Sequence, residues 1–206
     1  LLFWPAMLKT YGINNLDEVF VHGFLTIEGS KMSKSKGNFI LADKALTFAH
    51  PDYYRYYLCS KLNTDISDID FSVNDFVQKI NSDLIGKFIN IGSRTQNFLV
   101  KLNSSKVASG NISKSLEFKK NYEEIISLID RNEYSKALKI IMNIADKINA
   151  YVSTEEPWNK AKNDEENECI AICSEALNVF KDLTILLQSF IPSIADKIFS
   201  LLNVCL

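Results

Sequence analysis

Lysine and serine crowd into one short stretch of the chain. Three lysines and three serines fall within the seven residues from Ser30 to Lys36. Such a polar, cationic run does not pack into a hydrophobic core, so we expect a loop that faces solvent. Lysine ammonium groups and serine hydroxyls suit polyphosphate oxygens, as point charges and as hydrogen-bond donors. The stretch therefore predicts a polyphosphate-binding loop, with a solvated lysine turn or a localisation signal as the alternatives.

A second set of residues has side chains suited to RNA. Asn90 and Arg94 are four residues apart, so on a helix they share one face. An amide beside a guanidinium can read a base edge and grip a phosphate or stack on a base. Trp158 follows Pro157 at a predicted helix start. Taken alone, an exposed Asn/Arg pair is usually a solvated face and a single tryptophan usually packs in the core, so the RNA site is a hypothesis at this point.

Short elements must position the lysine loop. Residues 19–27 are apolar, β-branched and aromatic over too short a run for a helix, which predicts a buried strand. Residues 1–11 predict a helix whose buried face carries Trp4, Met7 and Leu8. Beyond the loop, the sequence predicts helices at about 42–49 and 51–63 and a one-sided strand at 65–71. A helix, a strand and a phosphate-type loop in this order are typical of the end of a doubly wound sheet.

The pattern changes at Ser72, where a long helical region begins. Serine is a good helix cap, and apolar residues then recur at helical spacing for about thirty residues. Further helical stripes are predicted at residues 122–129, 134–148, 172–190 and about 193–203. We therefore predict a mainly α fold: an antiparallel helix bundle, preceded by a small α/β segment that is the end of a Rossmann-type domain.

Composition narrows the class of protein. The 206 residues are 47% hydrophobic and carry a net charge of -2. A general nucleic-acid coat would be basic, so any RNA binding must use a local face. No apolar run reaches the roughly 18 residues of a membrane helix, and no basic region precedes the apolar start, so we expect neither a membrane span nor a signal peptide. Four cysteines with no histidine near them favour reduced thiols in a cytoplasmic protein, and no metal site.

One motif resembles a known family signature. Lys31-Met32-Ser33-Lys34-Ser35 resembles, letter for letter, the KMSKS signature of the class I aminoacyl-tRNA synthetases. Within that class, several stretches spread over the whole chain are similar to the methionyl-tRNA synthetases. They are Leu2-Phe3-Trp4-Pro5-Ala6-Met7-Leu8, Phe20-Val21-His22-Gly23, Arg55-Tyr56-Tyr57, Asp68-Ile69-Asp70, Asp75-Phe76-Val77, Asn90-Ile91-Gly92-Ser93-Arg94 and Glu156-Pro157-Trp158.

The resemblance implies roles for individual residues. The residues implied to bind ATP are Lys31, Met32, Ser33, Lys34 and Ser35. Among them Lys31 and Lys34 would be catalytic, because they meet the charge that develops on the leaving pyrophosphate. The anticodon-binding residues would be Asn90, Arg94 and Trp158, with the tryptophan stacked on the first base, a cytosine. His22 resembles a strand histidine of the family and receives no catalytic role.

The resemblance also implies an organisation and a parent activity. Residues 1–41 would end the catalytic domain, residues 42–71 would be an α/β linker, and residues 72–206 would be the anticodon-binding domain. The parent would use ATP and Mg²⁺ to activate methionine and transfer it to tRNA(Met). The chain lacks an initiator methionine and opens inside an apolar element, so we expect a piece of a longer protein.

The rest of the catalytic machinery is expected outside the chain. The family's HIGH signature, its methionine pocket and its zinc-bearing insertion would lie upstream of Leu1, so the chain alone is expected to be inactive. Three alternatives remain at this point: a tRNA-binding module without catalysis, a bundle that binds a protein partner, and a class I synthetase for Leu, Ile, Val or Cys.

Overall fold

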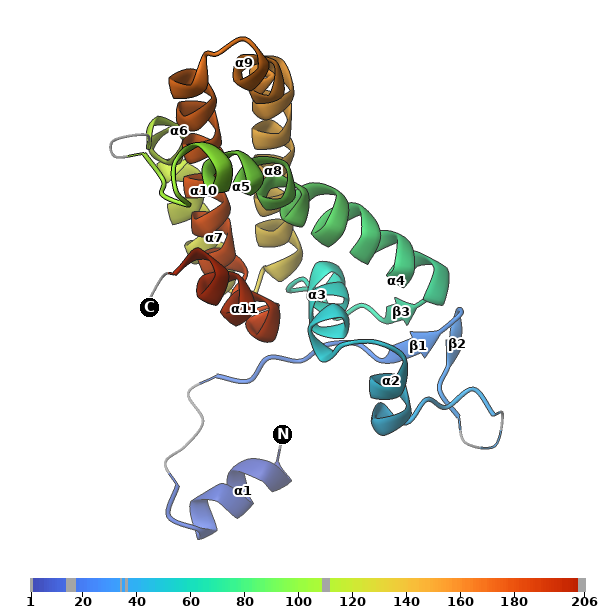
Figure 1. Cartoon of the computed structure of the whole chain (residues 1–206). Helices are drawn as coiled ribbons and strands as arrows, with labels where there is room; N and C mark the ends of the chain where they lie inside the picture. The colour runs from blue at the N-terminus through green and yellow to red at the C-terminus, as the bar shows by residue number, and fades with distance from the viewer. Residues whose placement is uncertain (1, 14–17, 34, 36, 109–111, 204–206) are drawn as a thin grey trace.

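A small sheet with two flanking helices lies at one end of the molecule, and a helix bundle forms the rest (Figure 1). A computed structural model describes residues 2–13, 18–33, 35, 37–108 and 112–203. The first part contains α1 (Phe3–Thr10), β1 (Leu25–Ile27), β2 (Ser30–Lys31), α2 (Ala42–Phe48), α3 (Pro51–Lys61) and β3 (Ile69–Phe71). The bundle contains α4 (Val73–Lys79), the π-helix η1 (Ile80–Ile89), α5 (Asn90–Leu102), α6 (Ser113–Glu117), α7 (Lys119–Asp130), α8 (Tyr134–Glu155), α9 (Pro157–Lys162), α10 (Glu166–Leu187) and α11 (Pro192–Leu202). The predicted mainly α fold is confirmed.

The sheet has the strand order β2-β1-β3, with β1 antiparallel to β2 and parallel to β3. Glu28 and Gly29 join β1 to β2 with φ values of 46° and 73°. Two residues of positive φ are what a tight hairpin of the right twist requires, and glycine adopts that backbone without strain. Asp70 of β3 fixes the turn, because its Oδ1 accepts from the Gly29 N–H at 2.8 Å and from Thr26 Oγ1 at 2.6 Å.

Two predictions about burial near the amino terminus are wrong. The helix α1 forms, but Trp4 is 70% exposed and Met7 is 61% exposed, and Figure 1 shows the helix apart from the rest of the molecule. The strand β1 covers only the last three residues of the predicted 19–27, and Val19 and Phe20 are exposed. Apolar side chains are buried only where a second layer covers them, and no described element covers these.

The long helix predicted from Ser72 is present as a rod of three consecutive segments, α4, η1 and α5. Its π-helical middle was not predicted. Ser72 is the residue before the first turn, but its side chain makes no capping hydrogen bond. The Val73 N–H instead donates to Glu28 Oε1 at 3.1 Å, which ties the rod to the hairpin turn.

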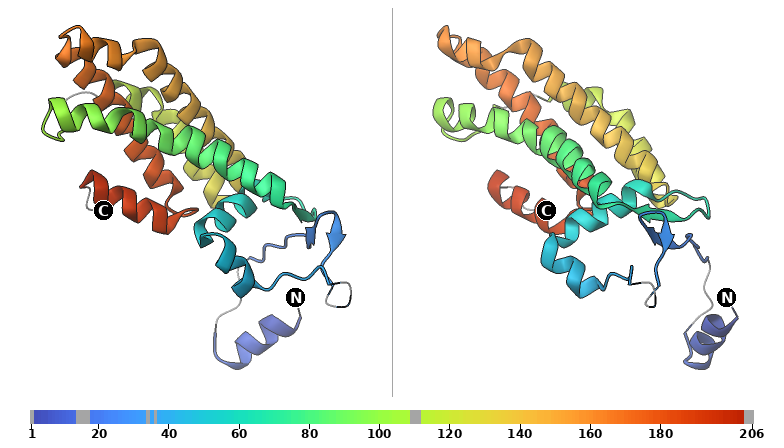
Figure 2. Two further views of the ribbon diagram at one scale, coloured as in Figure 1. Left: turned by 45° about the vertical axis from the view of Figure 1, so that its right-hand side comes forward. Right: turned by 90° about the vertical axis from the view of Figure 1, so that its right-hand side faces the viewer.

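The core of the bundle forms around α10, which packs against α5, α8 and α9. Helices α5 and α10 approach closely at Gly92, where an added Cβ would lie 3.1 Å from Phe180 Cε1. Two hydrogen bonds tie α3 to the corner between α10 and α11 and to α11 itself: Arg55 donates to the Ser189 carbonyl in the corner at 2.8 Å, and the buried Asp52 carboxylate accepts from the Ile194 N–H of α11 at 2.8 Å. These contacts fix the α/β part to the bundle, and Figure 2 shows the elongated molecule that results.

The remaining predictions of the sequence concern membranes and thiols. None of the described helices is long and apolar enough to cross a membrane. Cys59, Cys169 and Cys173 are free thiols, the last two buried, and Cys205 lies outside the described residues. Across the described part of the chain, no group of three or more His, Cys, Asp or Glu side chains is placed to hold a metal ion.

Candidate functional site

The lysine loop follows directly from β2. Lys31 is the last residue of that strand, and its Nζ lies 3.9 Å from the centroid of the Phe24 ring. An ammonium over an aromatic face is held by a cation–π attraction of modest strength. The Lys31 side chain is otherwise exposed, so its ammonium can leave the ring to bind an anionic ligand. Lys34, the other predicted catalytic lysine, lies outside the described residues.

Asn38 lies on the returning limb of the loop and closes it by two hydrogen bonds to the entering limb. Its Oδ1 accepts from the Ser33 N–H at 2.9 Å, and its Nδ2 donates to the Lys31 carbonyl at 3.1 Å. The hydroxyls of Ser33 and Ser35 lie 2.9 Å apart in a hydrogen bond of their own. Hydrogen bonds within the loop therefore involve Ser33, Ser35 and also Asn38, a residue for which the sequence analysis predicted no role.

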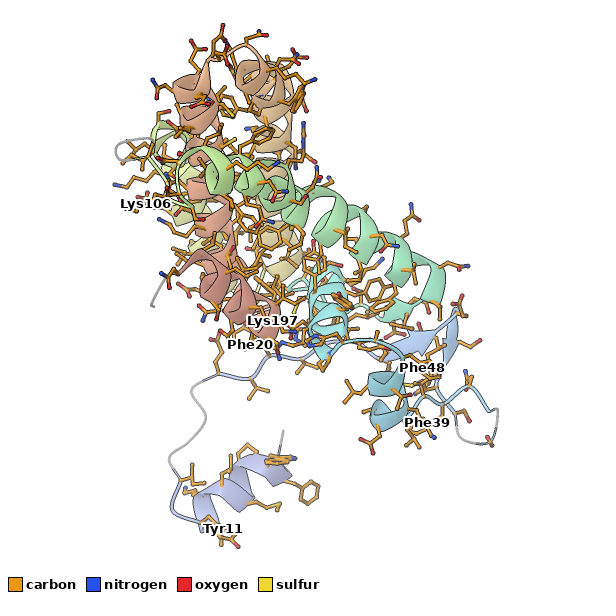
Figure 3. All side chains as sticks on the ribbon, viewed as in Figure 1. Tyr11, Phe20, Phe39, Phe48, Lys106 and Lys197 are labelled. Atoms are coloured by element: carbon orange, nitrogen blue, oxygen red, sulfur yellow. The ribbon has the colours of Figure 1, made fainter. Side chains whose placement is uncertain are left out.

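An apolar side chain of the loop points toward the sheet. Met32 lines a cavity of about 300 Å³ together with residues of β1, α2, α3 and β3. The Met32 thioether is apolar and offers no hydrogen-bond donor to phosphate, and its side chain faces this apolar cavity instead. Next to this cavity lies a largely apolar surface of α2, where Phe48 is 85% exposed (Figure 3).

At the other end of the molecule, the structure brings Asn90, Arg94 and Trp158 together. Arg94 lies one turn beyond Asn90 on α5, and its guanidinium carbon is 5.3 Å from the centre of the Trp158 ring. Trp158 stands in the first turn of α9, where Pro157 suits the fixed φ of a helix start. The preceding Glu156 has a φ of 46°, so the chain turns sharply there and returns toward α5.

Helix α8 supports this cluster with residues that the sequence did not indicate. The Arg94 guanidinium donates to the Asn149 carbonyl at 3.3 Å and to Ser153 Oγ at 3.0 Å. Asn90 Nδ2 donates to Asn149 Oδ1 at 3.0 Å. About one turn earlier in each segment, Lys87 Nζ of η1 bonds to Asp146 of α8 at 2.6 Å. All three cluster residues are half-buried, so each is braced by the bundle and still presents part of its side chain to solvent.

Basic groups lie beside the tryptophan. Lys160 on α9 forms ion pairs with Glu168 at 2.6 Å and Glu165 at 2.9 Å, and the hydrogen bonds that its ammonium donates to these two carboxylates raise its pKa. The ion pairs neutralise Lys160 in place and fix the start of α10 against α9. Lys162 ends the same helix.

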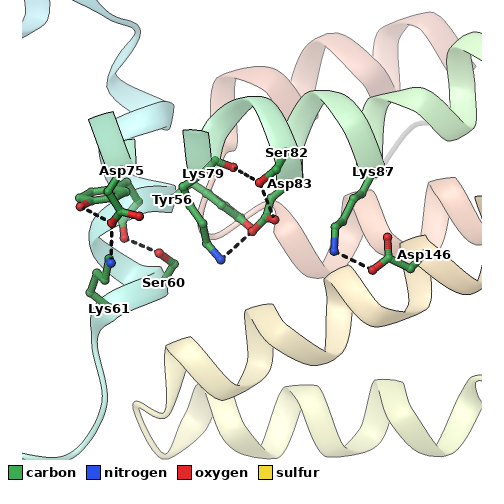
Figure 4. A network of polar contacts seen from close by, with 10 residues as sticks. Tyr56, Ser60, Lys61, Asp75, Lys79, Ser82, Asp83, Lys87 and Asp146 are labelled. Carbon is green, nitrogen blue, oxygen red and sulfur yellow. Dashed lines mark hydrogen bonds and ion pairs between the residues drawn. The ribbon is translucent and has the colours of Figure 1, made fainter. Parts of the chain in front are cut away.

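A polar network joins α3 to the rod, between the two candidate sites (Figure 4). The Tyr56 hydroxyl donates to Asp83 at 2.8 Å, and Lys79 pairs with the same carboxylate at 2.9 Å. Burial, followed by the Asp83 charge, raises the pKa of the Tyr56 hydroxyl. A second branch has Asp75 bonded to Lys61 at 2.6 Å and to the Tyr57 hydroxyl at 2.8 Å. Burial, with the Asp75 bond, raises the pKa of Tyr57 to about 12.

Comparisons with known proteins match both parts of the chain. Residues 1–96 match the family model described as tRNA synthetases class I (M). Residues 105–205 match the model for the anticodon binding domain of methionyl tRNA ligase. Together with the fold, these matches place the chain among the class I tRNA synthetases. Within that class, the chain belongs to the methionyl-tRNA synthetase family, which confirms the resemblance seen in the sequence.

Individual relatives agree with the family assignment. Over 98% of its length, the chain is 42% identical to a methionine–tRNA ligase of Ralstonia nicotianae and 44% identical to one of Thiobacillus denitrificans. In both cases the chain spans 30% of the relative's length.

Solved structures show the same likeness. A Mycobacterium tuberculosis methionyl-tRNA synthetase bound by methionyl-adenylate superposes with a TM-score of 0.81 at 26% identity, covering 99% of this chain and 42% of that one. A second structure of that synthetase, in complex with methionyl-adenylate, gives 0.79 at 26% identity, covering 96% of this chain and 40% of that one.

Proposed function

We propose that the protein containing this chain is a methionine–tRNA ligase, which activates methionine with ATP and transfers it to tRNA(Met). The observation that carries the proposal is the coexistence of two sites in one chain: a lysine loop closed by Asn38 and, at the far end of the bundle, the Asn90/Arg94/Trp158 cluster (Figure 1). A protein that charges a tRNA and also reads its anticodon needs both, because the amino-acid end of tRNA and its anticodon lie far apart.

The loop acts on the phosphates. Negative charge moves onto the departing pyrophosphate as the adenylate forms, and preorganised cations lower the energy of that transition state. Lys31 and Lys34 supply those cations, and Lys34 supplies the larger share. Met32 fastens the loop, and Ser33 and Ser35 hold its shape through hydrogen bonds. Mg²⁺ accompanies ATP as its counter-ion.

The cluster acts on the anticodon. The Trp158 ring offers a stacking platform for a base, and a base stacked on an aromatic ring contributes about 1–3 kcal/mol. The Arg94 guanidinium lies against the same ring, where its free donors can reach a base edge or a phosphate. Asn90 supplies the amide that distinguishes one base from another.

The division of labour follows the three regions named from the sequence. Residues 1–41 carry the loop at the end of the catalytic domain, residues 42–71 link the loop to the bundle, and residues 72–206 bind the anticodon. The hydrogen bonds that join Arg55 to the Ser189 carbonyl and the Asp52 carboxylate to the Ile194 N–H support a linker that is held firmly to the bundle. Translation in the cytoplasm is the setting of this activity.

Methionine-dependent ATP–pyrophosphate exchange and tRNA charging test the proposal. The full-length protein is expected to perform both reactions with methionine and tRNA(Met), and to show no exchange with leucine, isoleucine, valine or cysteine. The 206-residue chain alone is expected to show no exchange, because the relatives are about three times as long and their remaining part would hold the methionine pocket. Exchange by the isolated chain would show that the active site lies elsewhere than proposed.

A further inference from the structure

A hydrogen bond between the hairpin and the rod lies at the joint between the two candidate sites (Figure 1). Glu28 occupies the turn of the β1–β2 hairpin, three residues before Lys31, and its Oε1 accepts from the Val73 N–H at 3.1 Å. Val73 is the first residue of the rod, whose three consecutive segments end at Leu102 and carry Arg94. One carboxylate therefore joins the hairpin that leads into the lysine loop to the element that carries the proposed anticodon residues.

The turn itself does not require a glutamate. Glu28 has a φ of 46°, a left-handed conformation that is uncommon for residues other than glycine. Tight hairpins of this kind favour asparagine, aspartate or glycine at such a position, because those residues adopt positive φ more readily. Residues held in this region of backbone space cluster at functional positions. The Glu28 side chain has a use that the favoured residues of the turn do not share, because it is long enough to reach the rod.

The rod does not require a hydrogen-bond acceptor from so far along the chain. Ser72 directly precedes the rod, and serine is a good helix cap, but its side chain makes no capping hydrogen bond. The acceptor comes from Glu28, 45 residues away, and a carboxylate also suits the positive end of a helix. A cap from Ser72 would stabilise the rod alone, whereas the bond from Glu28 also restrains the angle between rod and hairpin. Asp75 restrains the same turn from α3, because it pairs with Lys61 at 2.6 Å.

The angle matters because the rod is long. Arg94 lies about 30 Å along the rod from Val73 at about 1.5 Å per residue, so a tilt of about 10° at the joint would displace it by about 5 Å. A tRNA engages two distant sites at once only where the protein holds them at the matching separation. We propose that Glu28 is a positioning residue for tRNA charging, whose bond to Val73 holds the lysine loop where the amino-acid end of an anticodon-bound tRNA arrives. This role rests on the proposed function, which assigns the two ends of the tRNA to the two sites.

Three measurements on the full-length protein test this role: methionine-dependent pyrophosphate exchange, charging of tRNA(Met), and binding of the isolated anticodon stem-loop. Glu28→Gly suits the backbone of the turn but removes the acceptor. It should lower kcat for charging roughly tenfold, the effect of losing one charge-assisted hydrogen bond. Exchange and stem-loop binding should stay at the wild-type level, because each uses one site only. Glu28→Gln keeps the reach and an acceptor oxygen, and should retain most of the charging rate.

A double variant separates positioning from stability. Ser72→Asp gives the rod a cap of its own, so adding it to Glu28→Gly should restore any lost thermal stability but not charging.

The outcomes also separate this role from the proposed function. Wild-type charging by Glu28→Gly, equal losses of exchange and charging, or recovery of charging in the double variant would overturn the positioning role alone. A wild-type protein that does not bind the anticodon stem-loop would overturn the anticodon assignment and the role of Glu28 with it. If Glu28→Gly does not fold, Glu28→Asn, which suits the same turn but is one methylene shorter, carries the same expectation.

Discussion

The Arg94 guanidinium carbon lies 5.3 Å from the centre of the Trp158 ring, although the two residues come from different helices. Two of the guanidinium contacts go to α8, to the Asn149 carbonyl and Ser153 Oγ. The arginine and the tryptophan therefore form one surface that the bundle holds in place before RNA arrives. A preformed surface of this kind loses little side-chain entropy on binding.

The second lysine of the loop should dominate the chemical step. In the full-length protein, Lys34→Ala is expected to slow adenylate formation by ~10²–10³-fold, the usual effect of losing one preorganised contact to a transition state. The methionine concentration for half-maximal exchange should barely change, because the loop meets phosphate. Lys44→Ala, at an exposed lysine of α2, is the matched control. A normal exchange rate in Lys34→Ala would remove Lys34 from the mechanism.

Asn38 should matter to the loop without touching the reaction. Asn38→Ala removes two hydrogen bonds, each contributing on the order of 1 kcal/mol, so exchange should slow roughly tenfold. The thermal midpoint of the protein should hardly change, because the loop is exposed. Asn143→Ala controls for the loss of an exposed amide, and an Asn38→Ala enzyme as fast as wild type would show that the loop needs no clamp.

The sequence predicted the helices of the bundle well, and it predicted contacts between distant segments poorly. The apolar spacing marks the bundle helices because burial of one helix face leaves a period of 3.6 residues. Asn149 gave no such signal. Its partners Asn90 and Lys87 lie 59 and 62 residues away, and a lone asparagine in a helical stripe looks like any solvated position. Trp4 and Phe20 show the opposite failure, because apolar character does not say which surface covers a side chain.

Asp83 should be the most costly carboxylate of the network to remove. Its side chain is 8% exposed and serves both Tyr56 and Lys79. Asp83→Ala leaves a buried hydroxyl and an ammonium without their partner, and should lower the free energy of unfolding by about 3 kcal/mol in urea. Asp146→Ala removes a half-exposed partner of Lys87 and should cost less than about 1 kcal/mol. Equal effects would show that the Asp83 network is as weak as a surface pair.

The hydrogen bonds of Asp70 at the hairpin turn should make the free energy of unfolding depend on pH. Hydrogen bonds from Thr26 and Gly29 hold the pKa of Asp70 below its ordinary value of 3.8. A lowered folded-state pKa means that the unfolded chain takes up protons first as the pH falls, so the Asp70 contribution is complete above 3.8 and is lost as the pH drops through the folded pKa. The urea midpoint should therefore fall on acidification from about pH 6 to about pH 3. Asp70→Asn should reduce that fall, and an unchanged pH profile would contradict the assignment.

The most direct test is the ratio of tRNA charging to pyrophosphate exchange in full-length Trp158→Ala. Losing one base–aromatic stack should remove about 1–3 kcal/mol of tRNA recognition, which corresponds to a fall of roughly 5- to 150-fold in kcat/KM for charging. Pyrophosphate exchange should stay at the wild-type rate. Trp158→Phe keeps an aromatic face and should recover much of the loss. A core tryptophan would instead destabilise the fold by about 3–5 kcal/mol when removed. Equal losses of charging and exchange, together with a large fall in melting temperature, would show that Trp158 is structural and would contradict the anticodon site.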